Sequence, residues 1–303
     1  MSTNGTDSSL LGIVFMLAGA AVFSISDAVT KYLTALYPAA EIMFLRAVFA
    51  LAVIAPLLVA RLGVHKVFAV QNRPGMFLLI LFGAGETLTF IWVLKYMPLA
   101  DATAVYFAAP LVVTLLAIPV LGERVGWYRL TAAITGFAGV ILIVRPEGGT
   151  GIGVAPLMAV LSMFLYALVL ITLRRVTATE NEARILIYVL ISFTVIGAVA
   201  TPFVWIMPTL ADAALMGLMG LVTSLGIFLV NRAFALAPAS VVAPLDYSYL
   251  VWATLYGYLF WGELPARTVW WGIGLIVVMG IYILYREDKT RRRIIPPHGG
   301  THP

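Results

Sequence analysis

Long apolar runs separated by short polar connections occupy nearly the whole chain. Each run ends near a charged residue, Pro or Gly, and each is close to the length of about 20 residues that an α-helix needs to cross a bilayer. The pattern predicts ten membrane-spanning helices, at residues 10–33, 41–60, 75–96, 100–121, 127–144, 152–174, 183–207, 211–235, 239–260 and 268–286. Because the connections are short, consecutive helices are expected to be antiparallel neighbours. The predicted fold class is therefore all-α integral membrane.

The composition agrees with this pattern and leaves no room for a soluble domain. Hydrophobic residues make up 62% of the 303 residues and charged residues only 11%, and the mean hydropathy is +1.02. A water-soluble fold cannot bury that much apolar surface. The first nine residues contain no Lys or Arg, so the apolar run that follows is predicted to be the first span and not a secretory signal peptide.

Missing residue types exclude several kinds of chemistry. Without Cys, the chain has no disulfide, thiolate metal site or iron–sulfur cluster. The histidines, His65, His298 and His302, lie outside the predicted helices, which argues against an axially ligated haem and an intramembrane zinc protease. The phosphate-binding motif of ATPases is absent as well. We expect no cofactor and no bound metal, and we expect that the chain is not an enzyme.

The positive charges predict which ends of the helices face the cytoplasm. The net charge is +5, but Lys and Arg are scattered at the ends of apolar runs, apart from residues 291–293, and do not form the basic face that a nucleic acid would need. Lys and Arg favour the cytoplasmic side of a membrane. Placing both termini there leaves only five of the 19 on the other side, namely Lys31, Arg46, Lys95, Arg145 and Arg267. The predicted location is the cell (inner) membrane, with both termini cytoplasmic.

An internal repeat divides the ten spans into two sets of five. Residues 98–105 (PLADATAV) resemble 235–242 (ALAPASVV), 121–123 (LGE) resemble 261–263 (WGE), and 139–145 (GVILIVR) resemble 280–286 (GIYILYR), at shifts of 137, 140 and 141 residues. Because five is an odd number, the second set enters the membrane from the opposite side. The sequence therefore predicts two inverted five-helix repeats, an arrangement typical of secondary transporters.

The predicted organisation follows from this repeat. Residues 1–9 form a cytoplasmic N-terminal tail, 10–147 the first five-helix repeat, 148–287 the inverted second repeat, and 288–303 a cytoplasmic basic tail. Two halves of opposite orientation can exchange conformations and so open a central site to either side of the membrane. A duplicated scaffold without a transport cycle is the alternative.

These segments carry a resemblance to a known family. The repeated opening of spans four and nine, Pro110 within span four, and the Gly-Glu pairs at 122–123 and 262–263 resemble the EamA-type transporters of the drug/metabolite transporter superfamily, over about residues 10 to 287. Within that superfamily, residues 243–252 (APLDYSYLVW) most resemble the amino-acid exporters, including exporters of aromatic amino acids. They also resemble uptake carriers for compounds such as S-adenosylmethionine.

Residues that occur in both repeats are interpreted as structural. The Gly-Glu pairs stand at membrane-boundary turns, where we expect them to cap one helix and direct the chain into the next. Spans five and ten contain small residues that suit close helix packing in lipid: Ala132, Gly136, Gly139, Gly272, Gly274 and Gly280. These two spans are predicted to form a support or a dimer surface, and the protein a monomer or homodimer.

Charged residues that occur in one repeat only are the stronger candidates for a binding site. A charge near the bilayer centre is costly, and it normally faces a polar interior. Glu86 lies midway along span three, with Gly83 and Phe90 on the same face; it is predicted to bind substrate or, alternatively, to be a protonated or paired structural carboxyl.

Two aspartates leave similar alternatives open. Asp27 shares a face of span one with Ser24 and Lys31, so it is either a site residue or a structural partner of Lys31. Asp246 in span nine is predicted either to bind a substrate amine or to pair with Arg232.

Aromatic and neutral polar residues complete the predicted substrate site. Tyr and Trp also concentrate at membrane interfaces whatever the function, and an aromatic stripe is often packing alone. The candidates are Ser24, Asp27, Glu86, Phe90, Tyr106, Tyr166, Ser224, Phe228, Asn231, Asp246, Tyr249 and Trp252. Arg46 is a less certain choice as a donor to the carboxylate of a zwitterionic substrate. The substrate site is expected at the interface between the two repeats.

The predicted function is secondary transport of small metabolites, amino acids first, by export or exchange. The two halves would rock about the central site, with Glu86 or Asp27 as the proton carrier in a proton-coupled cycle; uncoupled exchange is equally compatible. The alternatives are an uptake carrier or an exporter of drugs or cationic metabolites with the same fold, and, from another class, a membrane receptor or scaffold that does not transport. The expected partners are a small-molecule substrate and the lipid bilayer.

Overall fold

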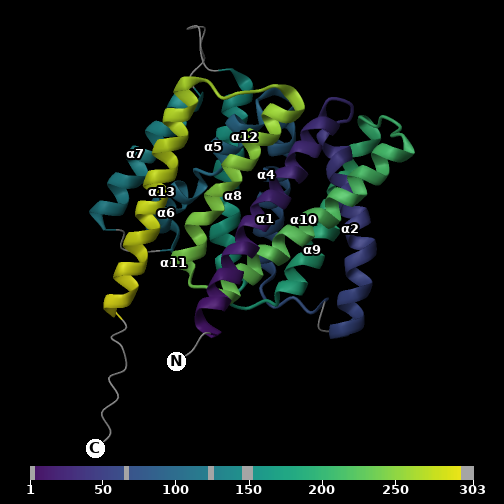
Figure 1. Cartoon of the computed structure of the whole chain (residues 1–303). Coiled ribbons are helices and arrows are strands. Elements are labelled where there is room, and N and C mark those ends of the chain that lie inside the picture. The colour runs from purple at the N-terminus through teal and green to yellow at the C-terminus, as the bar shows by residue number, and fades with distance from the viewer. Residues whose placement is uncertain (1–3, 65–67, 122–125, 145–152, 295–303) are drawn as a thin grey trace, which may run out of the picture.

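The protein is a bundle of α-helices in which the described residues contain no β-strand. The structure is a computed structural model that describes residues 4–64, 68–121, 126–144 and 153–294. The first half contains α1 (Asn4–Thr34), α2 (Ala39–Leu62), α4 (Arg73–Tyr96), α5 (Leu99–Tyr106), α6 (Ala109–Leu121) and α7 (Trp127–Val144). The second half contains α8 (Val154–Val176), α9 (Glu182–Ala200), η1 (Thr201–Phe203), α10 (Leu210–Leu236), α11 (Ala239–Val242), η2 (Ala243–Tyr247), α12 (Ser248–Trp261) and α13 (Arg267–Ile294). α1 begins and α13 ends at the same end of the bundle (Figure 1).

Nine segments of the described residues are helical, long and apolar enough to cross a membrane. They match nine of the ten predicted spans, although α1 begins at Asn4 and α13 continues to Ile294, beyond the ends expected from hydropathy. The tenth span, predicted at 239–260, is divided among α11, η2 and α12. The chain is a multi-pass integral membrane protein, as its hydrophobic pattern predicts.

Spans four and nine, which hold matching positions in the two halves, are both interrupted. α5 ends at Tyr106 and α6 begins at Ala109, just before Pro110, while η2 begins one residue before Pro244. Proline removes a backbone donor and clashes with the preceding turn, so each helix breaks nearby. Irregular backbone at membrane depth is tolerated only inside the protein or beside a water-filled cavity. The two breaks therefore indicate where a cavity can lie.

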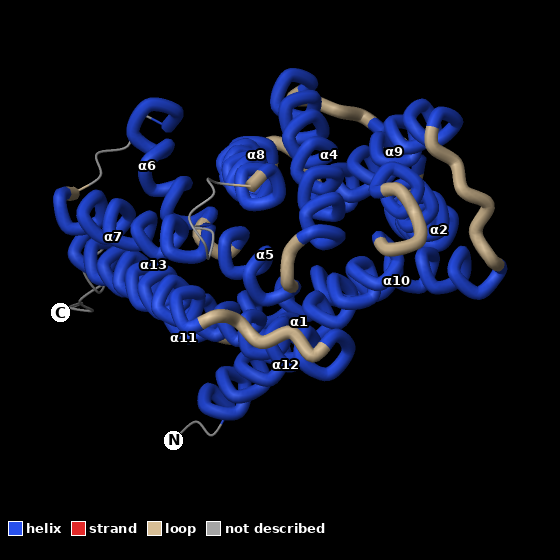
Figure 2. The backbone as a smooth tube through the Cα atoms, turned by 90° about the horizontal axis from the view of Figure 1, so that it is seen from above, coloured by secondary structure: helices blue, strands red, loops and turns tan. Residues whose placement is uncertain are grey.

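The helix packing has the reciprocity of two inverted repeats. α1 packs mainly on α10, and their repeat mates α8 and α4 pack on each other; α2 packs on its own mate α9, and α7 on its mate α13. The α7–α13 pair lies at one edge of the bundle and the α2–α9 pair at the opposite edge, with α1, α5 and α8 between them (Figure 2). Exchanging the halves leaves this set of contacts unchanged.

Glycines bring α7 and α13 into backbone contact. A Cβ atom on Gly139 would lie 2.7 Å from the carbonyl oxygen of Gly272, and one on Gly272 would lie 2.6 Å from the carbonyl oxygen of Gly139. Helices in lipid associate through this kind of close packing. The contact agrees with the close packing predicted for the small residues of spans five and ten.

Gly262 forms the turn that ends α12. Its φ of 67° is left-handed, and its N–H donates to the carbonyl of Tyr258 at 2.9 Å, while the N–H of Glu263 donates to the carbonyl of Gly257 at 3.1 Å. Glycine adopts this conformation without a Cβ penalty. The capping role predicted for Gly262 is confirmed; Gly122 and Glu123 lie outside the described residues.

Glu180 ties the turn between α8 and α9 to the start of α4. One of its carboxylate oxygens accepts hydrogen bonds from the backbone N–H groups of Gln71 and Asn72, each at 2.6 Å, and the other accepts from Arg184. Burial by itself raises the pKa of Glu180, but the hydrogen bonds from Asn72, Arg184 and Gln71 outweigh it, and the net pKa is below the usual value.

Candidate substrate-binding site

A cavity of about 620 Å³ lies between the two halves of the bundle. Its size falls within the range of about 300 to 1,000 Å³ that is usual for small-molecule sites. The wall includes these residues predicted from the sequence: Asp27, Glu86, Phe90, Tyr106, Tyr166, Asn231, Asp246 and Tyr249. Both helix breaks contribute to it, because Tyr106 ends α5 and Asp246 lies within η2.

The cavity extends toward the end of the bundle at which α1 begins. α1 and α10 are antiparallel, since Gly12 packs against Ala237 while Ser26 is hydrogen-bonded to Thr223. Asn231 and Phe234, near the end of α10, line the cavity and are exposed. They mark its mouth.

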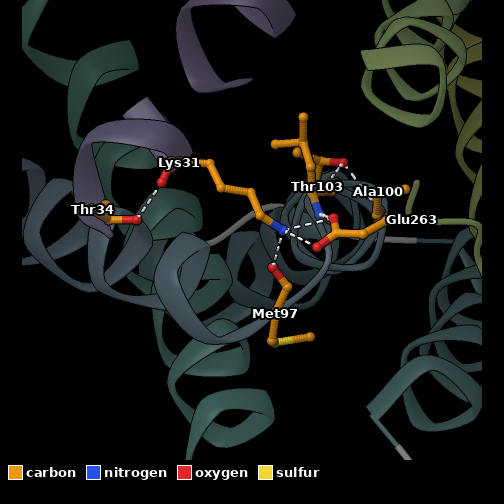
Figure 3. A network of polar contacts seen from close by, with 7 residues as sticks. Lys31, Thr34, Met97, Ala100, Thr103 and Glu263 are labelled. Carbon is orange, nitrogen blue, oxygen red and sulfur yellow. Dashed lines mark hydrogen bonds and ion pairs between the residues drawn. The ribbon is translucent and has the colours of Figure 1, made fainter. Parts of the chain in front are cut away.

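An ion pair between a buried lysine and a half-buried glutamate ties helices together beyond the opposite end of the cavity. Lys31 Nζ lies 2.6 Å from both carboxylate oxygens of Glu263 and donates to the carbonyl of Met97 at 2.9 Å. One Glu263 oxygen also accepts from the backbone N–H of Leu99 at 3.2 Å. Figure 3 shows these groups converging from α1, from the turn between α4 and α5, and from the turn after α12. Thr30, the residue before Lys31, lines the cavity, so the ion pair lies next to the inner end of the cavity.

The alternative in which Lys31 pairs with Asp27 is therefore not what the structure shows. Lys31 reaches across to Glu263, and the Asp27 carboxylate instead accepts a hydrogen bond from the Tyr249 hydroxyl of α12. The shared helical face is real, but each side chain finds its partner on another element.

Glu86 and Asp246 supply two further carboxylates to the wall. Glu86 accepts a hydrogen bond from the Thr87 hydroxyl at 3.0 Å. Within the described part of the chain, no ion pair joins Asp246 to Arg232, whose guanidinium lies 5.9 Å from the centre of the Phe228 ring. Asp246 thus faces the cavity, and the alternative interpretation, in which it pairs with Arg232, is not what the structure shows.

Aromatic rings form one side of the cavity. The rings of Tyr106 and Tyr166 are stacked with centroids 4.2 Å apart, and Phe90 lies against Tyr106 at 4.8 Å. Phe107 lies 4.9 Å from Tyr249. A flat ring can insert beside these faces with favourable offset or edge contacts.

The other predicted site residues lie off this wall. Ser24 is buried and its hydroxyl has no hydrogen-bond partner among the described residues, while Trp252 stacks on Tyr256 with centroids 6.2 Å apart. Ser224 donates to the carbonyl of Gly220 and faces a smaller neighbouring cavity of about 180 Å³. Phe228 is 53% exposed on the outside of the bundle.

One basic residue of the wall was a weaker candidate in the sequence. Arg46 of α2 lines the cavity between Thr30 and Thr223, whereas from the sequence it was only a less certain choice as a donor to a substrate carboxylate. Its position inside an apolar run, with no acid within one helical turn on its own face, was the signal available.

Comparison with known proteins identifies the architecture. A family model described as the EamA-like transporter family matches residues 10–145 and again residues 153–286. The chain belongs to the EamA-like transporter family. It is a membrane transporter of the drug/metabolite type, and the family named from its repeats is confirmed.

Relatives of this EamA-like chain are named for different cargoes. It is 31% identical over 290 residues to a riboflavin transporter of Rhizobium johnstonii, covering 94% of each chain. It is 28% identical to an S-adenosylmethionine uptake transporter of Rickettsia bellii, covering 94% of this chain and 97% of the relative. It is 29% identical to a pseudopaline exporter of Pseudomonas aeruginosa, covering 92% and 97%. Amino-acid export stays a prediction.

A solved structure shares the fold. A protein of known crystal structure superposes with a TM-score of 0.60 at 17% identity, covering 96% of this EamA-like chain and 99% of that chain. The likeness extends over the whole bundle and concerns the fold alone.

Proposed function

We propose that this chain is a secondary transporter that moves small amphoteric metabolites, amino acids first, by alternating access. The observation that carries the proposal is a charged cavity between two inverted halves that has a mouth at one end and the Lys31–Glu263 ion pair beyond the other. In such folds the substrate site lies at the interface of the repeats, and the halves rock around it. Breaking the Lys31–Glu263 ion pair would open the cavity to the opposite side.

The composition of the wall supports an amphoteric substrate with a flat group. Asp27, Glu86 and Asp246 offer carboxylates to an ammonium, Arg46 offers a cation to a carboxylate, and Tyr106 with Tyr166 offers a stacking face. Riboflavin and S-adenosylmethionine, for which relatives are named, both contain a flat heterocycle. Three acids against one base also favour a second candidate, transport of cationic metabolites.

The direction of transport follows from the gradients, since a reversible cycle can run either way. With both termini cytoplasmic, the mouth near Asn231 faces the cytoplasm, and the protein sits in the inner membrane in an inward-open arrangement. In a proton-coupled cycle Glu86 or Asp27 carries the proton; uncoupled exchange needs neither.

The test is flux of labelled amino acids into proteoliposomes, compared between the wild type and Glu86→Gln. We expect the substitution to slow flux by about tenfold or more, because a hydrogen bond to a charged group contributes about 1.5 to 3 kcal/mol and each 1.4 kcal/mol is tenfold. Glu182→Gln, at an exposed acid in the first turn of α9, is the matched control and should carry at the wild-type rate.

Other outcomes separate the alternatives. Wild-type flux in Glu86→Gln would remove Glu86 from the site. Flux of organic cations without flux of any amino acid would favour the cationic-metabolite candidate. Binding without flux in sealed vesicles would support a receptor.

A further inference from the structure

Arg46 is held in the cavity by two threonines from different helices. Its Nη1 donates to the Thr30 hydroxyl oxygen of α1 at 2.9 Å, and its Nη2 donates to the Thr223 hydroxyl oxygen of α10 at 2.7 Å. Thr30 in turn donates to the carbonyl of Ser26 at 2.7 Å, and Thr223 to the carbonyl of Met219 at 2.8 Å. Because both hydroxyl protons are directed to backbone carbonyls, both oxygens are left to accept from the guanidinium. The two hydroxyls fix its orientation.

The backbone around Arg46 adds to this constraint. A Cβ atom on Gly220 of α10 would lie 2.3 Å from the carbonyl oxygen of Arg46. Only glycine permits this approach, so α2 and α10 are in direct backbone contact at the level of the guanidinium. The backbone of Arg46 is thus fixed against α10, and its side chain is held by the two threonine hydroxyls.

In the part of the chain that the structure describes, no direct ion pair neutralises the positive charge of Arg46. Arginine stays protonated in proteins, and a charge inside the membrane normally pairs or marks a substrate path. Lys31 pairs with Glu263 and Arg184 with Glu180, whereas the described residues place no carboxylate within 4.0 Å of the Arg46 guanidinium. Asp27 and Glu86 face the same cavity, but they accept hydrogen bonds from Tyr249 and Thr87.

We propose that Arg46 binds the carboxylate of the substrate, with Thr30 and Thr223 as positioning residues. The guanidinium has five N–H donors, of which the threonines engage two, and the remainder can bind a carboxylate in the bidentate manner typical of arginine. The inference rests on the proposed transport of amphoteric metabolites and assigns the group that recognises their acidic end.

The charges of the cavity favour a carboxylate over a phosphate. Asp27, Glu86 and Asp246 already face the interior, so a dianion would add two negative charges, whereas a carboxylate adds one. In an amphoteric substrate the ammonium lies beside one of these acids and balances the negative charge that the substrate carboxylate adds. The substrate is therefore bound with its acidic end near Thr30, next to the closed end of the bundle.

The test compares ligands that share one ring and differ in charge, on the purified full-length protein. The probes are tryptophan, tryptamine, indole-3-propionate and phenyl phosphate, and the measurement is the concentration dependence of thermal stabilisation. In the wild type we expect tryptophan to bind more tightly than tryptamine. In Arg46→Gln we expect tryptophan to bind about tenfold more weakly or worse and tryptamine to bind as before.

Further variants separate recognition from structure. Thr30→Val and Thr223→Val keep the charge but lose its positioning, so each should weaken tryptophan selectively, as should Arg46→Lys, which lacks the bidentate fork. Lys95→Gln removes an exposed positive charge outside the cavity and should change neither ligand. A merely structural role for Arg46 would weaken all probes alike.

Three results would each overturn a different part of the proposal. Retention of the wild-type preference for tryptophan over tryptamine in Arg46→Gln overturns the assignment while leaving amino-acid transport intact. An Arg46-dependent response to phenyl phosphate without one to tryptophan or indole-3-propionate overturns the choice of a carboxylate. If no amino acid stabilises the wild type or is carried by it, the proposed function fails and this inference with it.

Discussion

At the scale of single residues, acidic side chains serve two different ends. In the cavity, Asp27 and Glu86 are bonded to neutral hydroxyls and face space that a ligand can fill. At the membrane boundary, Glu180 accepts two backbone N–H groups and pairs with Arg184. The first arrangement leaves the carboxylates available to a ligand, and the second fastens one turn to the start of a helix.

Glu180 gives a prediction about pH. Its pKa is lower in the folded chain than in the unfolded one, so its contribution to stability is fully present above the unfolded value of about 4.3 and is lost as the pH falls through the folded value. We expect Glu180→Gln to lower Tm by a few degrees at neutral pH, since about 1 kcal/mol shifts Tm by about 2 to 4 °C in a chain of 150 to 250 residues. Because glutamine does not titrate, the variant should lack the loss of stability on acidification.

Thermal unfolding in detergent measures this effect at about pH 7, above the unfolded pKa of Glu180, and at about pH 3.5, below it. The exposed neighbour Glu182→Gln is the control. Equal acid-induced losses in the wild type and Glu180→Gln would contradict the prediction.

The sequence predicted which residue types form the site better than which face of a helix carries them. On α10 the pattern selected Ser224, Phe228 and Asn231, whereas the wall is formed by Thr223, Ile227, Val230 and Phe234 together with Asn231. The predicted face of α10 was therefore rotated by about one residue from the face that lines the cavity. A helix that is apolar all round contains no periodicity to set its rotation, and only its packing against α1 and α2 does so.

At the scale of elements, the contact between α7 and α13 is set by the absence of side chains. We expect Gly139→Ala to destabilise the protein by about 1 to 3 kcal/mol, the usual cost of overpacking, because the new Cβ atom would meet the carbonyl oxygen of Gly272 at 2.7 Å. Gly274→Ala on α13, where a Cβ atom meets nothing within 4 Å, should be neutral or stabilising because alanine favours helix.

Thermal unfolding of both variants decides between close contact and helix propensity. If Gly139→Ala is as stable as Gly274→Ala, the backbones of α7 and α13 are farther apart than the distance of 2.7 Å between a Cβ atom on Gly139 and the carbonyl oxygen of Gly272 requires.

The interruptions of spans four and nine show what hydropathy cannot reveal. Pro110 and Pro244 were visible in the sequence, but the apolar runs around them continue without a gap, so each was predicted as one helix. A proline interrupts a helix, but the run around it stays apolar, so the hydropathy of the run does not reveal the break. The apolar runs therefore predicted the nine segments that are long and apolar enough to cross a membrane in the described part of the chain, but not the breaks within spans four and nine.

At the scale of the whole molecule, the Lys31–Glu263 ion pair is predicted to keep one side closed. Lys31→Gln removes the ion pair and leaves the half-buried Glu263 carboxylate without its cation, so it should raise the share of molecules open at that end. A change of about 1.4 kcal/mol is already tenfold in population.

The chain has no cysteine, so a single reporter such as Ile91→Cys, on the cavity wall, measures the opening with a membrane-impermeant maleimide added on the side of the membrane at which Lys31 and Glu263 lie. We expect slow labelling in the parent, faster labelling after Lys31→Gln, and slow labelling again when Lys31→Glu is combined with Glu263→Lys. Unchanged labelling in Lys31→Gln would show that the pair does not control access.

The reciprocal packing of α1 on α10 and of α8 on α4 has a consequence for how such a chain can arise. An interface in which each half offers the same two faces, exchanged, is isologous, like that of a symmetric dimer. Two copies of a single ancestral five-helix polypeptide, inserted in opposite orientations, would bury the same surfaces without being joined. Fusion into one chain would fix the two orientations and let each half diverge, so that carboxylates such as Glu86 and Asp246 could each occur in one half only.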